Sequence, residues 1–445
     1  MVSLVRFGML PRLVGIGHSL DIIFFGGRMR RHDTVVIVDF GAANGQAVAK
    51  AIRALNIYCE VVPYFATAER IAGLKPAALV LQRGTVCGAT TMERVATADP
   101  YSFGVPVLDM ACEAADAAAL ENFLVVRCGL KRDWTADSFI EVAVERIRAA
   151  ADGGKMLLAM SGGVDSSVCA ALAHRAVGSQ LVSVYVDHGL MRKGETAEVC
   201  DVFGKQLGIE LNHINAADRF LARLAGVVDP EQKRRIIGEE FIRVFEEAAL
   251  GAGNPEYLVQ GTIYPDIIES GAGGGKAVKA HHNVGGLPER IAFKGIIEPL
   301  KYLFKDEVRQ VALALGIPAS IAMRQPFPGP GLAVRCIGEI TRERLDILRE
   351  ADAIFRAAVV EAGLERIAGQ YFAVLTNNRS VGMDEGGRTY AYTVALRAVQ
   401  TSDYMQARFV RIPMEVLAAV SGRITATIPQ VNRVVYDITD KPPAT

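Results

Sequence analysis

Apolar runs alternate with amphipathic segments from residue 32 onward, and this alternation predicts a series of α/β blocks. Thr34–Asp39 is expected to form a buried strand, followed by a glycine-containing turn and an amphipathic helix at Gln46–Leu55. Two further apolar runs, Ala77–Leu81 and Val105–Asp109, fit the same scheme. The pattern therefore predicts a small parallel sheet, which breaks off where an alanine-rich segment leads into a new helix near Ser138–Ala151.

A second α/β block follows this break. It opens with a predicted strand at Lys155–Met160, a glycine-serine loop and a helix at Val168–Ala176. Further strands at Leu181–Val186 and Tyr257–Gln260 alternate with helical segments. Strands that alternate with helices predict a doubly wound parallel sheet.

A third block begins after the proline and glycine residues of Pro326–Gly331, and it mixes helices with strands in an α+β pattern. The predicted helices are Arg342–Ala362 and Met414–Thr425, and the predicted strands are Tyr371–Leu375, Ala391–Ala398 and Arg433–Ile438. The patterns divide the chain into an N-terminal extension at residues 1–31 and blocks at residues 32–125, 126–325 and 326–445.

Length and composition agree with several soluble domains. A chain of 445 residues is long enough for two to four domains. Its formal net charge is zero, which gives no global field for nucleic acid or an anionic membrane, so a small-molecule substrate is expected. The seven cysteines are scattered without a C-x-x-C pair, as is typical of reduced thiols in a cytoplasmic protein. No stretch reaches the roughly 18 apolar residues of a spanning helix.

The first 31 residues carry basic positions around a short apolar stretch, without a clean small-residue cleavage site. A targeting peptide is one interpretation of this composition. A disordered extension, or a start codon placed too early, fits the segment better.

The segment Ser161–Ser167 (Ser-Gly-Gly-Val-Asp-Ser-Ser) stands between a predicted strand and a predicted helix. At such a junction backbone amides and the helix dipole converge on a phosphate, and glycines permit its close approach. Serine hydroxyls add donors, and Asp165 is the residue type that holds Mg2+ against pyrophosphate oxygens. The segment lacks the lysine of the ordinary P-loop, so it does not predict transfer of a terminal phosphate.

This pattern resembles the pyrophosphate loop of N-type ATP pyrophosphatases, which split ATP between the α and β phosphates and adenylate an oxygen. From about Asp133 to its C-terminus the chain resembles one family of that group, the GMP synthetases. The resemblance implies that the O2 of xanthosine monophosphate attacks the α-phosphate, pyrophosphate leaves, and ammonia attacks C2 to give GMP and AMP. The segments that carry it are Asp187–Arg192, Lys233–Gly238, Gly261–Ser270, His281–Pro288, Phe304–Arg309 and Pro326–Leu332.

The reaction needs fixed positive potential around the α-phosphate and the leaving pyrophosphate. By the resemblance, Mg2+ is held on Asp165, Lys305 is a second cation, and residues around 266–283 form a lid that excludes water from the adenylated intermediate. The catalytic residues so implied are Asp165, Asp266, Glu269, Lys279, His281, His282 and Lys305. Those implied for ATP and pyrophosphate are Ser161, Gly162, Gly163, Val164, Asp165, Ser166 and Ser167, and those for the substrate are Arg234, Asn283 and Lys441.

Each of these assignments has a plainer alternative. The glycine run Gly271–Gly275 is compatible with a flexible linker, and His281 with its neighbour is compatible with a solvated turn or a stray metal site. Arg234 suits bidentate phosphate binding, although a charge run is more often a solvated helix face. Within the motif we favour the lid and the substrate contact.

The third block resembles the dimerisation domain of the family, so a homodimer is implied. Its C-terminal Lys-Pro-Pro-Ala-Thr segment contributes to the substrate site in the family, and Lys441 matches the contacting lysine. The chain ends at Thr445, where the family pattern continues with isoleucine, glutamate, tryptophan and glutamate. Two other departures are Gln325, where the family has histidine, and Ala280, where it has a hydroxyl residue.

Residues 33–112 resemble about half of a class I glutamine amidotransferase, through Asp39–Gly41 and Val105–Leu108. That chemistry needs a cysteine on a tight elbow, a histidine, a carboxylate and an oxyanion loop. Cys112 falls near the nucleophile position, but glutamate and alanines follow it, and Gln82–Thr85 replaces the oxyanion loop. No histidine occurs from Asp33 to Ala173.

A cysteine without a base keeps an ordinary pKa near 8.5 and stays protonated at neutral pH. Cys112 is therefore interpreted as a degenerate nucleophile, buried and structural. The chain is expected to use free ammonia, or ammonia from a separate glutaminase subunit.

Two other functions remain open at this point. Another N-type pyrophosphatase, such as an NAD synthetase or a tRNA-thiolating enzyme, shares the serine-glycine loop but lacks the His281–Asn283 segment and the lysine-proline end. A nucleotide-binding pseudoenzyme would be a relic whose decay began in the first block. Intact Asp165, Lys305 and His281 argue against the pseudoenzyme, because drift would have reached the loop and the lid as well.

Overall fold

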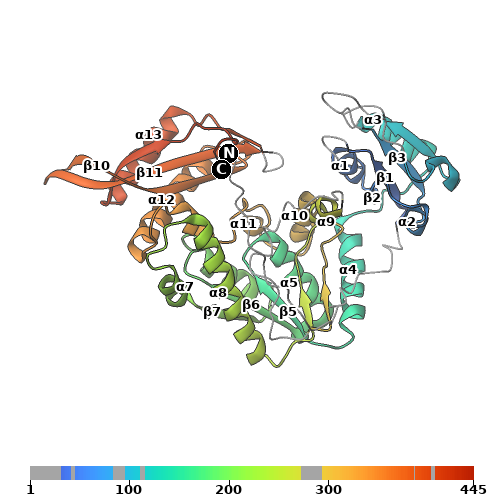
Figure 1. The fold of residues 1–445 in the computed structure, drawn as a ribbon, viewed down its shortest axis with the longest axis horizontal. Coiled ribbons are helices and arrows are strands. Elements are labelled where there is room, and N and C mark those ends of the chain that lie inside the picture. Colours follow the sequence, from blue (N-terminus) through green and yellow to red (C-terminus); the bar gives the residue numbers. More distant parts are fainter. Residues whose placement is uncertain are drawn as a thin grey trace, which may run out of the picture.

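Three bodies lie side by side along the long axis of the molecule (Figure 1), two of them α/β with parallel sheets and the third α+β with a mainly antiparallel sheet, which confirms the predicted mixed architecture. The structure is a computed structural model. It describes residues 32–41, 46–83, 96–110, 116–271, 293–384, 386–401 and 406–444. The predicted extension at residues 1–31 and the candidate Cys112 lie outside these residues. Within them, no helix combines the length and apolar character needed to cross a membrane.

The first body is built on a four-stranded parallel sheet with the order β2-β1-β3-β4. Its strands are β1 (Val35–Asp39), β2 (Cys59–Pro63), β3 (Ala78–Gln82) and β4 (Val107–Met110). The prediction of three strands missed β2, because Glu60 and Pro63 interrupt its apolar pattern. The central strands β1 and β3 are almost wholly buried, as expected of a parallel sheet covered on both faces.

Each face of this small sheet has its own core. One contains Val36, Val38 and Leu79, and the other contains Val35 and Ile37 together with two rings from the middle body, described below. The helical elements around the sheet are α1 (Ala47–Ala54), α2 (Ala68–Gly73), a 3-10 turn (Pro100–Phe103), α3 (Ala117–Glu121) and a π-helical segment (Asn122–Arg127).

The middle body is a five-stranded parallel sheet with the order β7-β6-β5-β8-β9, so the chain starts at the centre and winds outward in both directions. This confirms the doubly wound sheet. Its strands are β5 (Met156–Met160), β6 (Leu181–Asp187), β7 (Leu211–Asn215), β8 (Tyr257–Val259) and β9 (Gly295–Ile297). Its helical elements are α4 (Ala136–Ala151), α5 (Val164–Val177), a 3-10 turn (Gly178–Gln180), α6 (Glu195–Cys200), a π-helical segment (Asp201–Gln206), α7 (Ala217–Leu224), α8 (Pro230–Gly251), α9 (Tyr264–Gly271), α10 (Lys305–Ala314) and α11 (Ala319–Ala322).

The third body, at the C-terminal end, has β11 at the centre of its sheet, antiparallel to β10 and β12 and parallel to β13. The hairpin of β10 and β11 projects to the left in Figure 1. Both strands run far beyond the predicted ranges, because their outer part exposes residues such as Val381 and Met383 and so carries no buried pattern. The elements are a 3-10 segment (Gly331–Arg335), α12 (Arg342–Glu361), β10 (Gln370–Asp384), β11 (Gly387–Thr401), β12 (Ala407–Phe409), α13 (Met414–Thr427) and β13 (Val431–Tyr436).

The middle and C-terminal bodies share one continuous core and are joined by buried polar groups. The Lys233 ammonium on α8 is 1% exposed and donates to the carbonyls of Cys336, at 2.8 Å, and Gly338. Gln325 donates to the Tyr371 carbonyl and accepts from the Tyr371 amide, both at 2.9 Å. The glutamine that departs from the family pattern thus ties the end of the middle body to β10.

Asp352 on α12 stands at the centre of a second buried contact between these bodies. Its carboxylate is 1% exposed and lies 3.7 Å from Arg192, 3.9 Å from Arg335 and 4.0 Å from Arg356. The Ala373 amide donates to it at 3.1 Å. Burial lowers the pKa of Arg192 to about 10 and that of Arg335 to about 9, so both side chains remain cations at neutral pH.

Candidate functional site

The loop between β5 and α5 carries the predicted phosphate-binding residues. α5 begins at Val164, four residues before its predicted start, so Val164–Ser167 form the first turn of the helix rather than part of the loop. The glycine-serine composition masked this start. Gly162 has a φ of +75°, and a Cβ there would lie 3.1 Å from the Val199 side chain, so glycine suits this turn.

Hydroxyl groups hold the loop in shape. Ser161 Oγ and Ser166 Oγ lie 3.1 Å apart, and Ser166 Oγ donates to the Gly163 carbonyl at 3.0 Å. Ser167 is fully buried and donates to the same carbonyl at 2.8 Å, so its hydroxyl supports the turn. No side chain in the described residues caps α5, which leaves its first-turn amides as donors for an anion.

Asp165 and Lys305 meet beside this loop. The Lys305 ammonium donates to both carboxylate oxygens of Asp165, at 2.8 and 2.7 Å, and each side chain is about one third exposed. Lys305 is the first residue of α10, so two helix starts converge here. A Cβ on Gly261 would lie 3.4 Å from Asp165 Cβ, which shows how closely the segment after β8 approaches. The single carboxylate beside serine hydroxyls fits Mg2+, which takes one or two carboxylates and completes its shell with phosphate and water.

Arg324 is a loop contact that the sequence prediction missed. Its guanidinium donates to the Gly162 carbonyl at 3.2 Å and to Glu195 at 2.8 Å, and it also pairs with Glu198. The side chain is 8% exposed. It stands two residues before Pro326, just outside the Pro326–Leu332 motif. Arg324 therefore fixes the position of the glycine turn from the far end of the middle body.

The other predicted residues lie in different settings. Asp266 accepts from the Ile263 amide at 3.1 Å, in the first turn of α9. Arg234 on α8 is exposed and pairs with Glu231 at 2.5 Å, so in the described part of the chain its partner is on its own helix. Lys441 pairs through its backbone with Ala407.

Most of the proposed lid lies outside the residues that the structure describes. The backbone at Glu269 belongs to α9, but its side chain is not described. Four predicted residues, and the departure at position 280, lie outside the described residues: Lys279, His281, His282 and Asn283. Their roles stay predictions.

His188 lies in the turn after β6, and its protonation is expected to make the free energy of unfolding depend on pH. Burial lowers its pKa to about 4, against the opposite effect of Asp187, and its Nδ1 accepts from the Leu190 amide at 3.1 Å. The unfolded chain, with an ordinary pKa near 6.5, binds a proton first as the pH falls. Stability from this group is thus complete above pH 6.5 and is lost toward pH 4, by about 2 kcal/mol at pH 5.

The measurement is urea unfolding of the wild type and of His188→Asn at pH 7 and pH 5. Asparagine keeps an acceptor near the Leu190 amide but does not titrate. We expect the variant to lose about 2 kcal/mol less than the wild type over this range. Equal losses in both proteins would show that His188 does not contribute.

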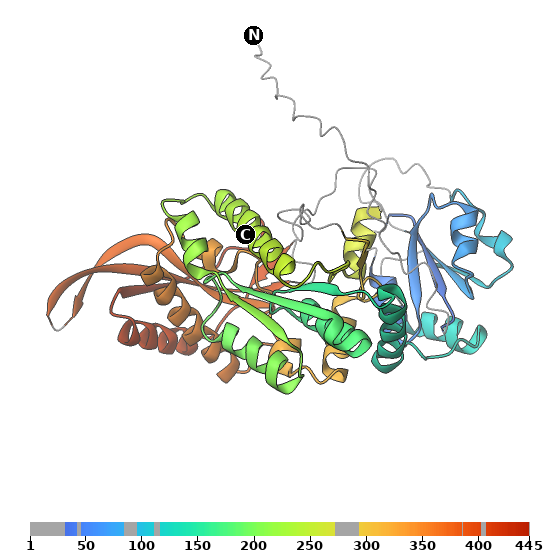
Figure 2. The same ribbon diagram turned by 90° about the horizontal axis from the view of Figure 1, so that it is seen from below.

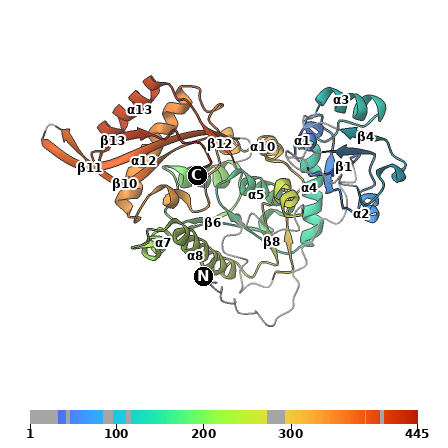
Figure 3. The same ribbon diagram turned by 45° about the horizontal axis from the view of Figure 1, so that its top comes forward.

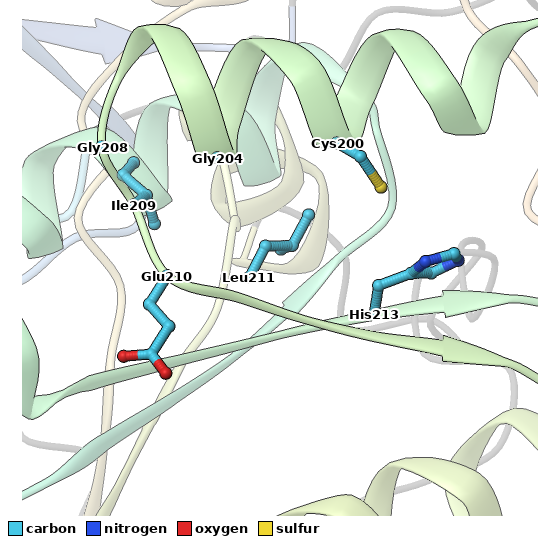
Figure 4. Close-up of a pocket in the computed structure, with 7 residues that line it drawn as sticks. All are labelled: Cys200, Gly204, Gly208, Ile209, Glu210, Leu211 and His213. Atoms are coloured by element: carbon cyan, nitrogen blue, oxygen red, sulfur yellow. The ribbon is translucent and has the colours of Figure 1, made fainter.

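A shallow pocket lies apart from the loop, between the end of α6 with its π-helical extension and β7 (Figure 4). Cys200 and His213 line it with Glu210. Burial raises the pKa of Cys200, which disfavours the thiolate. None of the predicted site residues lines this pocket, so it does not define the chemistry.

Comparisons with known proteins give the family context of this geometry. Residues 357–445 match the family described as GMP synthase C terminal domain, and residues 136–243 match NAD synthase. A glutamine-hydrolyzing GMP synthase of Acetivibrio thermocellus is 44% identical over 505 positions, covering 93% of this chain and 99% of that protein. One from Clostridium botulinum is 43% identical over 508 positions, with 93% and 99% covered.

A third relative, the glutamine-hydrolyzing GMP synthase of Treponema denticola, is 56% identical over 326 residues, which is 73% of this chain and 62% of that protein. The alignments to the first two are longer than this chain of 445 residues, so the chain is shorter than those relatives and lacks internal segments that they have. Among solved structures, an NMN synthetase from Francisella tularensis covers 45% of this chain and 78% of its own at 15% identity, with a TM-score of 0.35.

Proposed function

Because the chain belongs to the GMP synthase family, we propose that it aminates xanthosine monophosphate to GMP through an adenylated intermediate at the segment Ser161–Ser167, which comprises the loop after β5 and the first turn of α5. It is an ATP-dependent ligase. The observation that carries the site is the meeting of Asp165 and Lys305 at the start of two helices, beside uncapped amides. The Lys305 ammonium and the uncapped amides of α5 are the groups that supply positive potential where pyrophosphate departs.

The residues divide the work of binding and activation. The first-turn amides of α5 and the Ser161 hydroxyl bind the outer phosphates of ATP, and Ser166, which donates to the Gly163 carbonyl, holds the turn that presents them. Lys305 offsets the charge that develops on the leaving pyrophosphate, and Arg324 holds the glycine turn in place. Mg2+ bound at Asp165 supplies Lewis-acid neutralisation of the phosphate oxygens. The segment that contains His281 closes over the nucleotide and excludes water.

The products of ATP test this function. Purified protein is incubated with ATP, Mg2+, ammonium and xanthosine monophosphate, and the nucleotides are separated. AMP, pyrophosphate and GMP in equal amounts are expected, and pyrophosphate release depends on xanthosine monophosphate. ADP as the product, or pyrophosphate release that ignores xanthosine monophosphate, would contradict the proposal.

We infer further that the first body no longer hydrolyses glutamine. The support is chemical, because no histidine lies between Asp33 and Ala173 to activate a cysteine. With ammonium as donor, GMP formation is expected to exceed the glutamine-dependent rate by at least about a hundredfold. Addition of an unrelated glutaminase should restore the rate with glutamine, which shows that ammonia alone was lacking. If the purified protein alone formed GMP with glutamine at a rate comparable to that with ammonium, the inference would be wrong.

We also propose a homodimer in the cytoplasm. The apolar side chains of Val381, Met383 and Tyr390 on the β10–β11 hairpin are 61%, 82% and 65% exposed, which suits a surface that a second subunit covers. The described cysteines are all free, as suits a reducing compartment.

A further inference from the structure

The seam between the first and middle bodies is organised around one buried cation, Arg53. This residue lies on α1, in the body that carries no chemistry of its own in the proposed function. Its guanidinium donates to Glu307 on α10, at 2.9 and 3.2 Å, and to the Cys59 carbonyl at 2.8 Å. The Arg53 side chain is 3% exposed, and that of Glu307 is 15% exposed. The ion pair therefore joins two bodies out of contact with bulk water.

Aromatic rings enclose this guanidinium and fix its place. Its central carbon lies 4.6 Å from the Tyr58 ring centroid, 4.7 Å from that of Trp134, and 5.7 Å from those of Tyr264 and Phe304. Trp134 also donates its indole N–H to Glu307. The cation–π contacts favour the charged form, so a neutral side chain would lose more than one interaction.

Glu307 connects this cluster to the proposed catalytic centre. Its carboxylate accepts from the Phe304 amide at 2.7 Å, which caps the first turn of α10. Lys305 follows Phe304 in the sequence, and its ammonium donates to an Asp165 carboxylate oxygen at 2.7 Å. Arg53 thus contacts the carboxylate that caps α10, the helix whose first residue is Lys305.

The start of α9 is tied to the same seam. The Tyr264 amide donates to the Leu303 carbonyl at 2.9 Å, and the Tyr264 hydroxyl accepts from the Val61 amide on β2. α9 and α10 lie on the side of the middle body that faces the small sheet (Figures 1 and 3). Two helices that carry proposed site residues therefore begin against the first body.

We propose that Arg53 is a positioning residue for the amination reaction, acting through Glu307 on the orientation of Lys305. The first body, although shortened, is then part of the synthetase machinery. This inference rests on the proposed function, because the role of Lys305 is assigned there. A purely stabilising role explains the pair less well, because buried ion pairs often contribute no more than an apolar replacement.

A double-mutant cycle tests the inference. The kcat for pyrophosphate release, at saturating ATP, ammonium and xanthosine monophosphate, is measured for Arg53→Met, Lys305→Met and the double variant. Arg53→Met should lower kcat about tenfold or more, since small misplacements of a catalytic group are costly. The double variant should be no worse than Lys305→Met alone, because both changes remove the same effect. Arg53→Lys, which keeps the charge, should recover part of the rate.

Two further variants separate positioning from stability. Asp133→Asn removes the charge of the carboxylate that lies 2.7 Å from His32 across the same seam and makes no change at Glu307, so its kcat should stay within about twofold. Glu307→Gln removes the charge but keeps the shape of the side chain. It should reproduce the loss seen in Arg53→Met, and it carries the test if Arg53→Met fails to fold.

The outcomes are distinguishable. If Lys305→Met is inactive while Arg53→Met and Glu307→Gln keep the wild-type kcat, the inference is overturned and the proposed function stands. Multiplicative losses in the double variant also overturn it, since they show independent effects. If Lys305→Met is fully active, the site assignment and the inference fall together.

Discussion

The Asp165→Asn variant is expected to keep its fold and to lose about a hundred- to a thousandfold in kcat for GMP formation. The carboxylate is the proposed Mg2+ ligand beside the loop, and it also holds Lys305 in place. Stability should change by about 1 kcal/mol or less, because the pair with Lys305 is one third exposed and such pairs contribute little. The measurements are GMP formation with ammonium and the thermal midpoint of unfolding.

A matched control is present in the same body. Asp201 pairs with Lys205 at 2.8 Å, a distance like that between Asp165 and Lys305, but both side chains are exposed and lie outside the proposed site. Asp201→Asn makes the same chemical change and should leave kcat within about twofold. An Asp165→Asn protein that retained more than a tenth of the wild-type kcat would contradict the role proposed for the Asp165 carboxylate.

The Asp352→Asn variant is expected to be destabilised by about 3–5 kcal/mol, because it removes the charged carboxylate closest to the buried guanidinium groups. Asp352 lies within 4.0 Å of three arginines and is itself 1% exposed. Arg192 and Arg335 are 4% and 5% exposed, so solvent water cannot stabilise their positive charges once the Asp352 carboxylate is neutralised. Urea unfolding and the thermal midpoint measure the effect.

The control for this prediction lies on the same helix. Asp346 pairs with Arg349 one turn away at 2.7 Å, and its side chain is 71% exposed. Asp346→Asn should change stability by about 0.5 kcal/mol or less. Similar losses in both variants would mean that the buried cluster adds nothing beyond a surface pair.

Regular elements with a strong apolar period could be predicted from the sequence. β5 begins within one residue of its predicted start, and α12 at the predicted residue, because each has a continuous buried stripe bounded by polar residues. β2 was missed because Glu60 and Pro63 interrupt the apolar pattern of its five residues. The outer hairpin of β10 and β11 was underestimated for a related reason, since its exposed faces contain apolar residues such as Val381.

The candidate site divides in the same way. The loop at Ser161–Ser167 is contiguous, so its chemistry could be predicted from neighbouring residues. Arg324 and the pair of Arg53 with Glu307 could not, because the contacting residues are 162 and 254 positions apart. Charged residues in helices usually face solvent, so a single sequence gives no signal that Arg53 is buried.

Two side chains of the middle body form part of the hydrophobic core of the small sheet. Tyr264 and Phe304, which begin α9 and immediately precede α10, complete the core against Val35 and Ile37 (Figure 2 shows the two bodies in contact). Deletion of the whole first body would expose the Tyr264 and Phe304 rings to solvent at the starts of α9 and α10. The part of the first body that packs on these two rings is therefore required. We expect further deletion to be tolerated only in the parts of the small sheet that face away from the middle body.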